Sequence, residues 1–172
     1  ELKEHFFKIR NGVWKSKSVR SYGAFPSDPY SHTPAHAGAQ QPGMTGQVKE
    51  EIITRMGELG CIVEDGCLTF QPTLMRKTEF LTKAREFTYF NISKEKSQME
   101  IQKDELVYTY CQVPIVYHLS DKDWLINIYY TDGKVENIKS NKISKTVSQS
   151  IFSRNNLIKE IRVECPASSL LF

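Results

Sequence analysis

Residues 61–70 read CIVEDGCLTF, and this stretch decides the fold because the pattern changes there from helix to strand. Asp65-Gly66 between two short strand-like runs is a strong signal for a two-residue hairpin turn. In that register Cys61 lies opposite Phe70, and Cys67 points to the other face of the hairpin. We therefore predict a β-hairpin whose two cysteines do not bond to each other.

Short runs rich in β-branched and aromatic residues follow this hairpin, separated by polar turns. Asp132-Gly133 predicts a second hairpin of the same chemistry, whereas Pro114 indicates a bend or an edge position. Strands at this spacing favour a sandwich. The predicted fold class is mainly β, an antiparallel β-sandwich with an N-terminal helix, a long Pro-rich loop and a second helix. The predicted strands cover 87–92, 98–102, 106–112, 113–119, 124–130, 134–138 and 158–165, with one or two helical turns within 143–154.

Upstream of the hairpin, residues 45–59 have the pattern of an amphipathic helix. Thr45 is the expected N-cap, and Gly60 is a natural C′ residue that ends the helix. Apolar residues recur along this segment at helical spacing, which predicts one stripe facing a core. The stripe consists of Val48, Ile52, Met56 and Leu59. A shorter helix is predicted for residues 1–10, so the chain divides into a helix-loop-helix segment, 1–60, and a β-sandwich domain, 61–172.

Between the two helices, the loop starting at Tyr22 contains four X-Pro steps. Each proline fixes its own φ and pushes the preceding residue toward extended geometry, which stiffens the loop without a sheet ladder. Polar side chains between the prolines offer donors and acceptors that suit a polyhydroxylated ligand such as a sugar. A packed connector is the alternative interpretation. The predicted ligand-binding residues are Asp28, Tyr30, His32, His36, Gln40 and Gln41.

The loop and the helix after it also contain side chains that could act in catalysis. A carboxylate beside a polar pocket can act as a general acid or base if burial raises its pKa, and Glu50 and Glu51 are the candidates. The alternative function is therefore a free-standing hydrolase that uses Asp28, His32 or His36 with Glu51. Because the two histidines share no helical face and lack an HExxH context, we predict no metal site and no cofactor.

Composition limits the classes of partner. The net charge of +3 comes from 23 basic and 20 acidic residues mixed along the chain, without the basic blocks of a nucleic-acid binder. No run approaches the roughly 18 apolar residues that a membrane span needs, so we expect a soluble globule. The chain opens ELKEHFF, without an initiator Met or a signal-peptide pattern, which we interpret as a fragment or a processed product. Localisation is not predicted.

Cysteines and strand aromatics have two interpretations each. The four cysteines show no CxxC spacing, and buried free thiols are the preferred interpretation.

The strand aromatics could form a sugar-stacking platform, but Tyr and Trp are favoured in strands and core packing is preferred. His118 follows a strand and is interpreted as a hydrogen-bonded structural residue. The aromatics in question are Tyr108, Tyr110, Tyr117, Trp124, Tyr129 and Tyr130.

Residues 43–61 read GMTGQVKEEIITRMGELGC, and residues 64–81 read EDGCLTFQPTLMRKTEFL. This layout resembles the end of cellobiose-phosphorylase-like and related (α/α)6-toroid enzymes. In that family a last toroid helix leads into a small β-sandwich through a DG turn and a following proline. The corresponding residues here are Asp65-Gly66, Leu68, Phe70 and Pro72. The chain lacks the toroid that supplies the catalytic carboxylates, so no catalytic residue is carried over.

The resemblance and the polar loop together predict a non-catalytic or partial module of a carbohydrate-active protein. Such a module would be an accessory part of a glycoside hydrolase or a phosphorylase. Its partner would be a carbohydrate or a larger catalytic domain, with the Pro-rich loop making the contact. The hydrolase described above and a purely structural domain are the alternatives.

Overall fold

The structure is a computed structural model of the 172-residue chain, and it describes residues 1–2, 4–8 and 47–170. The side chains of residues 47–51 lie outside this description. The chain divides into two units, Glu1–Gly57 and Glu58–Phe172, and each is described by itself.

The described part of the first unit is helical. Residues 4–8 form a helix, as predicted for 1–10, and α3 (Gln47–Glu58) falls within the predicted 45–59. The predicted N-cap Thr45 lies outside the described residues. The predicted apolar stripe is wrong at Ile52, which is 55% exposed. Helical spacing places residues on one face of a helix, but it does not say how far the core covers that face.

Gly60 confirms the predicted end of the helix. Its φ is +68°, in the left-handed region that favours glycine. A Cβ at this position would lie 2.1 Å from the backbone carbonyl carbon of Gln71. Gly60 is therefore required both by its conformation and by the close approach of another backbone segment.

The hairpin at residues 61–70 forms as predicted. β1 (Cys61–Glu64) pairs antiparallel with β2 (Cys67–Phe70), and Cys61 lies opposite Phe70. Asp65 and Gly66 both have positive φ, as a two-residue type I′ turn requires. All four cysteines are free thiols, which confirms that Cys61 and Cys67 are not bonded.

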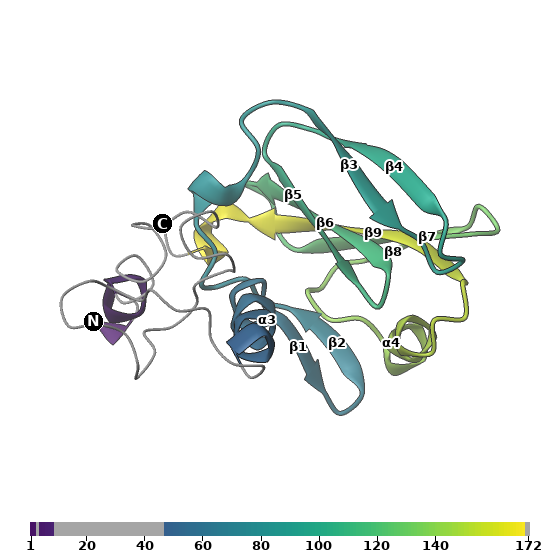
Figure 1. The fold of residues 1–172 in the computed structure, drawn as a ribbon, viewed down its shortest axis with the longest axis horizontal. Coiled ribbons are helices and arrows are strands. Elements are labelled where there is room, and N and C mark those ends of the chain that lie inside the picture. The colour runs from purple at the N-terminus through teal and green to yellow at the C-terminus, as the bar shows by residue number, and fades with distance from the viewer. Residues whose placement is uncertain (3, 9–46, 171–172) are drawn as a thin grey trace. The chain divides into compact units, whose positions relative to one another are not determined.

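The remaining described strands form a separate two-stranded hairpin and a larger sheet (Figure 1). β3 (Arg85–Phe90) pairs with β4 (Lys96–Ile101), and five strands form a sheet of order β5-β6-β9-β7-β8. The fold is mainly β, as predicted, but the described strands do not form two sheets of comparable size, so the sandwich is not confirmed. The sheet contains β5 (Glu105–Tyr110), β6 (Val113–Ser120), β7 (Leu125–Tyr130), β8 (Val135–Ile138) and β9 (Ile158–Pro166), with α4 (Lys145–Phe152) between β8 and β9.

Two details of the sheet correct the sequence-based expectations. β9 runs parallel to β6, so the wholly antiparallel prediction is wrong for this pair. Parallel neighbours need a long crossover connection, and β7, β8 and α4 supply it. Pro114 lies in the interior strand β6 rather than at an edge or a bend, but pairing with β9 begins only at Ile115. Pro114, which has no N–H to donate, therefore lies before the point at which β6 pairs with β9.

The β7–β8 connection confirms the second predicted hairpin with a different turn. Three residues, Thr131 to Gly133, separate the closing pair, in which the Tyr130 N–H donates to the Lys134 carbonyl at 2.9 Å. Within this turn only Gly133 has a positive φ, +90°. This pattern is that of a three-residue loop with glycine at its left-handed position, not of a two-residue turn.

The core lies on one face of the five-stranded sheet, which packs against α4 and the β1–β2 hairpin. The ring of Phe70 meets the ring of Tyr117 edge to face, with centroids 5.9 Å apart. On β9 the alternation predicted from the sequence is confirmed, because Ile161 and Val163 point into this core. The buried side chains include Leu68, Phe70, Met75, Ile115, Tyr117, Ile126, Ile128, Val147, Ile151, Ile161 and Val163.

A chain of three hydrogen bonds fastens the start of β1 to the sheet. The Tyr117 hydroxyl donates to the Leu59 carbonyl at 2.7 Å, and the Tyr108 hydroxyl donates to Tyr117 at 3.0 Å. Since both phenol protons are used, the Cys61 thiol is the donor in its 2.9 Å contact with Tyr108. Burial raises the pKa of Cys61 to about 11, so the thiol keeps its proton at neutral pH.

Candidate functional site

The predicted ligand-binding residues Asp28, Tyr30, His32, His36, Gln40 and Gln41 all lie outside the described residues. The side chains of Glu50 and Glu51 also lie outside them. The predicted sugar site in the loop and the predicted hydrolase site therefore stay predictions. Within the described residues, the feature that presents side chains around cavities is the β3–β4 hairpin.

The turn of this hairpin is built around Asn91. Its side-chain oxygen accepts from the Glu95 N–H at 3.0 Å, and its amide donates to the Ser97 hydroxyl at 3.2 Å. Asparagine favours turns because its side chain bonds to nearby backbone in this way. From the β5–β6 turn, the Gln112 amide donates to the Asn91 carbonyl at 3.0 Å. The hairpin tip is thus both internally braced and tied to the large sheet.

The inner face of the hairpin lies over the sheet face opposite the core (Figure 1). Arg85 pairs with Ile101 and Phe87 with Met99, and these positions share that face. The rings of Phe87 and Tyr89 stack at 5.7 Å between centroids. Burial and the nearby carboxylate of Glu160, on β9, raise the pKa of Tyr89. The hairpin therefore forms a partial second layer over the sheet.

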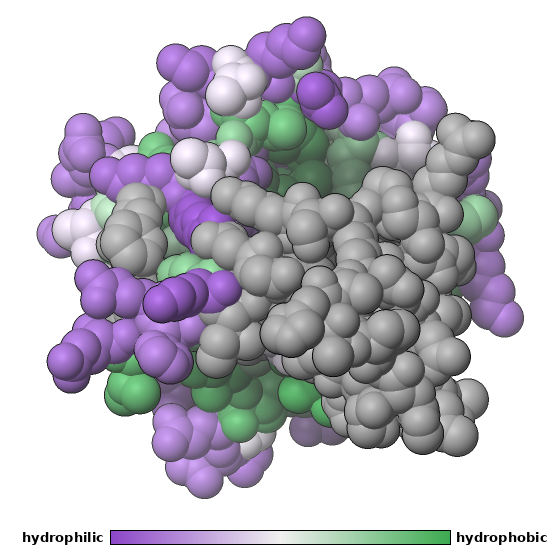
Figure 2. All heavy atoms as spheres, turned by 60° about the vertical axis from the view of Figure 1, so that its left-hand side comes forward, coloured by the Kyte–Doolittle hydropathy of each residue, from purple (hydrophilic) through white to green (hydrophobic). Residues whose placement is uncertain are grey.

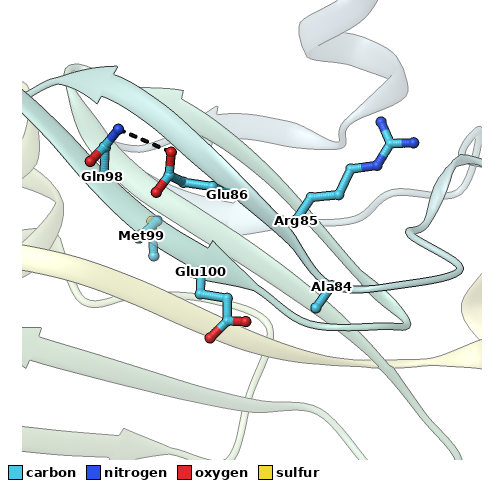
Figure 3. A pocket seen from close by; sticks show the side chains of 6 residues that line it. All are labelled: Ala84, Arg85, Glu86, Gln98, Met99 and Glu100. Carbon is cyan, nitrogen blue, oxygen red and sulfur yellow. Dashed lines mark hydrogen bonds between the residues drawn. The ribbon is translucent and has the colours of Figure 1, made fainter.

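The outer face of the hairpin carries a polar cavity of about 420 Å³ (Figure 3). Glu86 lies opposite Glu100 in the ladder, and the Gln98 amide donates to Glu86 Oε1 at 3.0 Å. Figure 3 shows the Arg85 side chain pointing away from the Glu86–Gln98 pair. The cavity is lined by Ala84, Arg85, Glu86, Gln98, Met99 and Glu100.

A second cavity, of about 300 Å³, lies between the hairpin and β5. Most of its wall is apolar, and Ile101 is almost fully buried there. In the upper part of the view in Figure 2, hydrophobic side chains lie behind hydrophilic ones at the surface. Arg85 and Glu86 line this inner cavity as well as the outer one. The complete lining is Glu79, Leu81, Arg85, Glu86, Phe87, Ile101, Glu105, Leu106 and Val107.

The polar floor of the inner cavity is Glu105, which is 5% exposed. Its Oε1 accepts from Arg162 at 3.0 Å, and its Oε2 accepts from the Gln102 N–H at 2.8 Å. Arg162 also donates to Glu160 at 2.8 Å. Burying a carboxylate is costly unless it has such hydrogen-bond and ion-pair partners. The Glu105–Arg162 pair therefore holds β5 and β9 together across β6.

His118 lies beside this network. Its Nδ1 is 4.0 Å from Glu105 Oε1, which is longer than a hydrogen bond. From the sequence we interpret His118 as a hydrogen-bonded structural residue. The structure places it beside the buried carboxylate of Glu105 but shows no hydrogen bond between them. Sequence reasoning missed Glu105 and Arg162, because these partners are 57 positions apart and no local pattern links them.

The six strand aromatics singled out in the sequence differ in burial. Tyr117 is fully buried, which supports core packing for that residue, while the other five strand aromatics are half-buried. Among the described residues, no group of three His, Cys, Asp or Glu is placed to hold a metal ion. In the same part of the chain, every helix is too short or too polar to cross a bilayer.

No protein-family model matches the chain, and no curated protein matches it. The resemblance of residues 44–81 to the end of (α/α)6-toroid enzymes therefore stays a prediction.

Proposed function

We propose that this chain is a carbohydrate-binding module, an accessory part of a carbohydrate-active protein. The observation that carries the proposal is the outer face of the β3–β4 hairpin. Glu86, Gln98 and Glu100 place planar carboxylate and amide groups around an open cavity of about 420 Å³. Carboxylates accept and amides both donate and accept, so this set can bond to the hydroxyl groups of a sugar.

The position of these groups also favours binding. They project from paired strands, and the hairpin that carries them is braced at its tip by Asn91 and Gln112. Groups held on regular elements are positioned more accurately than groups on loops, which lowers the entropy lost on binding. The polar residues predicted between Asp28 and Gln41 are a separate candidate for sugar binding.

A glycan array probed with the whole 172-residue chain tests the proposal. We expect binding to at least one glycan class, and a three- to tenfold loss of affinity in Gln98→Ala, about the value of one neutral hydrogen bond. The matched control is Gln149→Ala, because Gln149 is exposed on α4, away from both cavities. Absence of binding to every glycan would overturn the proposal, as would equal affinities for the two variants.

The loop is tested in the same experiment with Tyr30→Ala and His32→Ala. The matched control for the second variant is His5→Ala, since His5 is exposed in the helix at residues 4–8. We expect both loop variants to weaken binding and the control to leave it unchanged. If the loop variants bind like the parent chain while Gln98→Ala does not, the site is confined to the hairpin.

A further inference from the structure

The inner and outer cavities of the β3–β4 hairpin have two residues in common. Arg85 and Glu86 line both of them, although neighbouring residues of a strand point to opposite faces. A ligand in one cavity is therefore separated from the other only by the start of β3. An extended ligand that passes this point can occupy both cavities.

We infer that the inner cavity is a second sugar subsite, so that the protein takes an oligosaccharide rather than a single sugar. This inference rests on the proposed function, because it assigns the same class of ligand to a further cavity. The outer cavity holds one sugar unit between Glu86, Gln98 and Glu100. The inner cavity holds the next unit behind β3.

The walls of the inner cavity match the shape of a sugar ring. A pyranose has apolar faces made of C–H groups and a rim of hydroxyl groups. Phe87, Leu81 and Val107 supply an aromatic and two aliphatic surfaces for the C–H faces. With a volume of about 300 Å³, the cavity is at the lower end of the range for small-ligand sites. One ring, and not a large ligand, is therefore the expected occupant.

The polar groups of the inner cavity suit hydroxyl groups, because both acceptors and donors line it. Glu79, Glu86 and Glu105 provide acceptors, and Arg85 provides donors. A carboxylate would be repelled by the three glutamates. An ammonium group would be attracted by Glu79 and Glu86 but repelled by Arg85, and Glu105 is already paired with Arg162. Hydroxyl groups donate and accept, so they can bond to both kinds of partner.

Two of these groups have bonding capacity left. Each oxygen of Glu105 accepts one protein hydrogen bond, and each has a second acceptor position. The guanidinium of Arg85 makes no hydrogen bond or ion pair within the described part of the chain, and it is exposed. A sugar at this place can therefore bond to Arg85 and Glu105 without displacing a protein contact.

Titrations of the whole chain with sugars of increasing length test this inference. The probes are the mono-, di- and trisaccharides of the β-1,4-linked glucose, mannose and galactose series, followed by methyl NMR shifts of Ile101, Leu81 and Val107. We expect the disaccharide of at least one series to bind at least tenfold more tightly than its monosaccharide and to shift these methyl signals. Equal affinity along all three series, or unmoved methyl signals at saturation, overturns the inference.

Variants of the inner cavity separate the two subsites. Arg85→Gln and Phe87→Leu should each weaken disaccharide binding about three- to tenfold. Phe87 lines only the inner cavity, so Phe87→Leu should change monosaccharide binding less than twofold. The matched controls are Arg154→Gln, at an exposed arginine beyond α4, and Phe90→Leu, on the opposite face of β3. Arg85 is exposed, so its variant remains informative if Phe87→Leu folds poorly.

The outcomes also separate this inference from the proposed function. Array binding that depends on Gln98 but not on sugar length or Arg85 removes the inner subsite and keeps the carbohydrate-binding module. No binding on the array removes both. Phenethylamine is added as a charged probe, and methyl shifts caused by this amine but by none of the sugars would assign the cavity to a cation instead.

Discussion

Two hairpins of the second unit, β1–β2 and β3–β4, have the same secondary structure and different surroundings. In β2, Leu68 and Phe70 are fully buried, and the Phe70 N–H donates to the Asn141 carbonyl at 2.8 Å. In β3, Phe87 and Tyr89 are only half-buried, and Phe90 is 65% exposed. Both hairpins are pairs of antiparallel strands. Only β1–β2 places an aromatic ring, that of Phe70, fully inside the core.

This difference separates stability from recognition. A hairpin with a buried strand such as β2 contributes mainly apolar burial, which is the dominant favourable term in folding. A hairpin with cavities on both faces contributes less burial and leaves polar groups available to a ligand. Substitutions in β1–β2 should therefore change the free energy of unfolding, and substitutions in β3–β4 should change binding.

The largest expected effect comes from removing one phenylalanine from each hairpin. Phe70→Ala deletes a fully buried ring and should lower the free energy of unfolding by about 3–5 kcal/mol. Phe90→Ala deletes an exposed ring and should change it by about 0.5 kcal/mol or less. Urea unfolding followed by circular dichroism measures both values. Equal losses in the two variants would show that the hairpins do not differ in the way described.

A smaller effect is expected from the hydrogen-bond chain that fastens β1. Tyr117→Phe removes the bond to the Leu59 carbonyl and the acceptor for Tyr108, so buried polar groups lose their partners. The expected loss is about 1–3 kcal/mol of unfolding free energy. Tyr129→Phe is the matched control, because the Tyr129 hydroxyl makes no hydrogen bond among the described residues. A loss in the control as large as in Tyr117→Phe would remove the role assigned to the chain.

The smallest effect is a dependence of stability on alkaline pH. Burial raises the pKa of Cys61 from 9.0 to about 11, and the folded protein therefore binds this proton more tightly than the unfolded chain. The resulting stability is fully present below pH 9 and is lost as the pH rises from 9 toward 11. Urea unfolding at pH 8 and pH 10 should show a fall of about 1 kcal/mol from this group.

The variant Cys61→Ala isolates that contribution. Its stability should fall less between pH 8 and pH 10 than that of the parent chain, since it has no thiol to ionise. Burial also raises the pKa values of Tyr108 and Tyr117 well above their usual range, so their contribution is lost at higher pH. The same fall in the variant and the parent would show that Cys61 is not the titrating group.

Part of the candidate site could be predicted from sequence and part could not. The runs 87–92 and 98–102 were correctly placed on strands, and a polar turn between them was expected. The cavities could not be predicted, because they depend on the separation between the hairpin and β5. The residues predicted to bind sugar, Asp28 to Gln41, lie outside the described residues, so that prediction is still to be tested.

Local chemistry was enough to determine several features from the sequence alone. Asp65-Gly66 specifies a turn with two positive φ angles, and that turn sets the register in which Cys61 faces Phe70. The alternation in β9 likewise specifies which side chains point into the core, because strand side chains alternate with a period of two. These features depend on neighbours along the chain, and the sequence contains them.

Only the tertiary structure decided which strands far apart in the sequence became neighbours. The parallel pairing of β6 with β9, the interior position of Pro114 and the Glu105–Arg162 pair all join segments far apart in sequence. Alternation tells which face of a strand is buried but not which strand lies beside it. The physical reason is that long-range pairing follows from packing the whole core at once. The same packing buried Leu68 and Phe70 of β2 and left cavities at both faces of β3–β4.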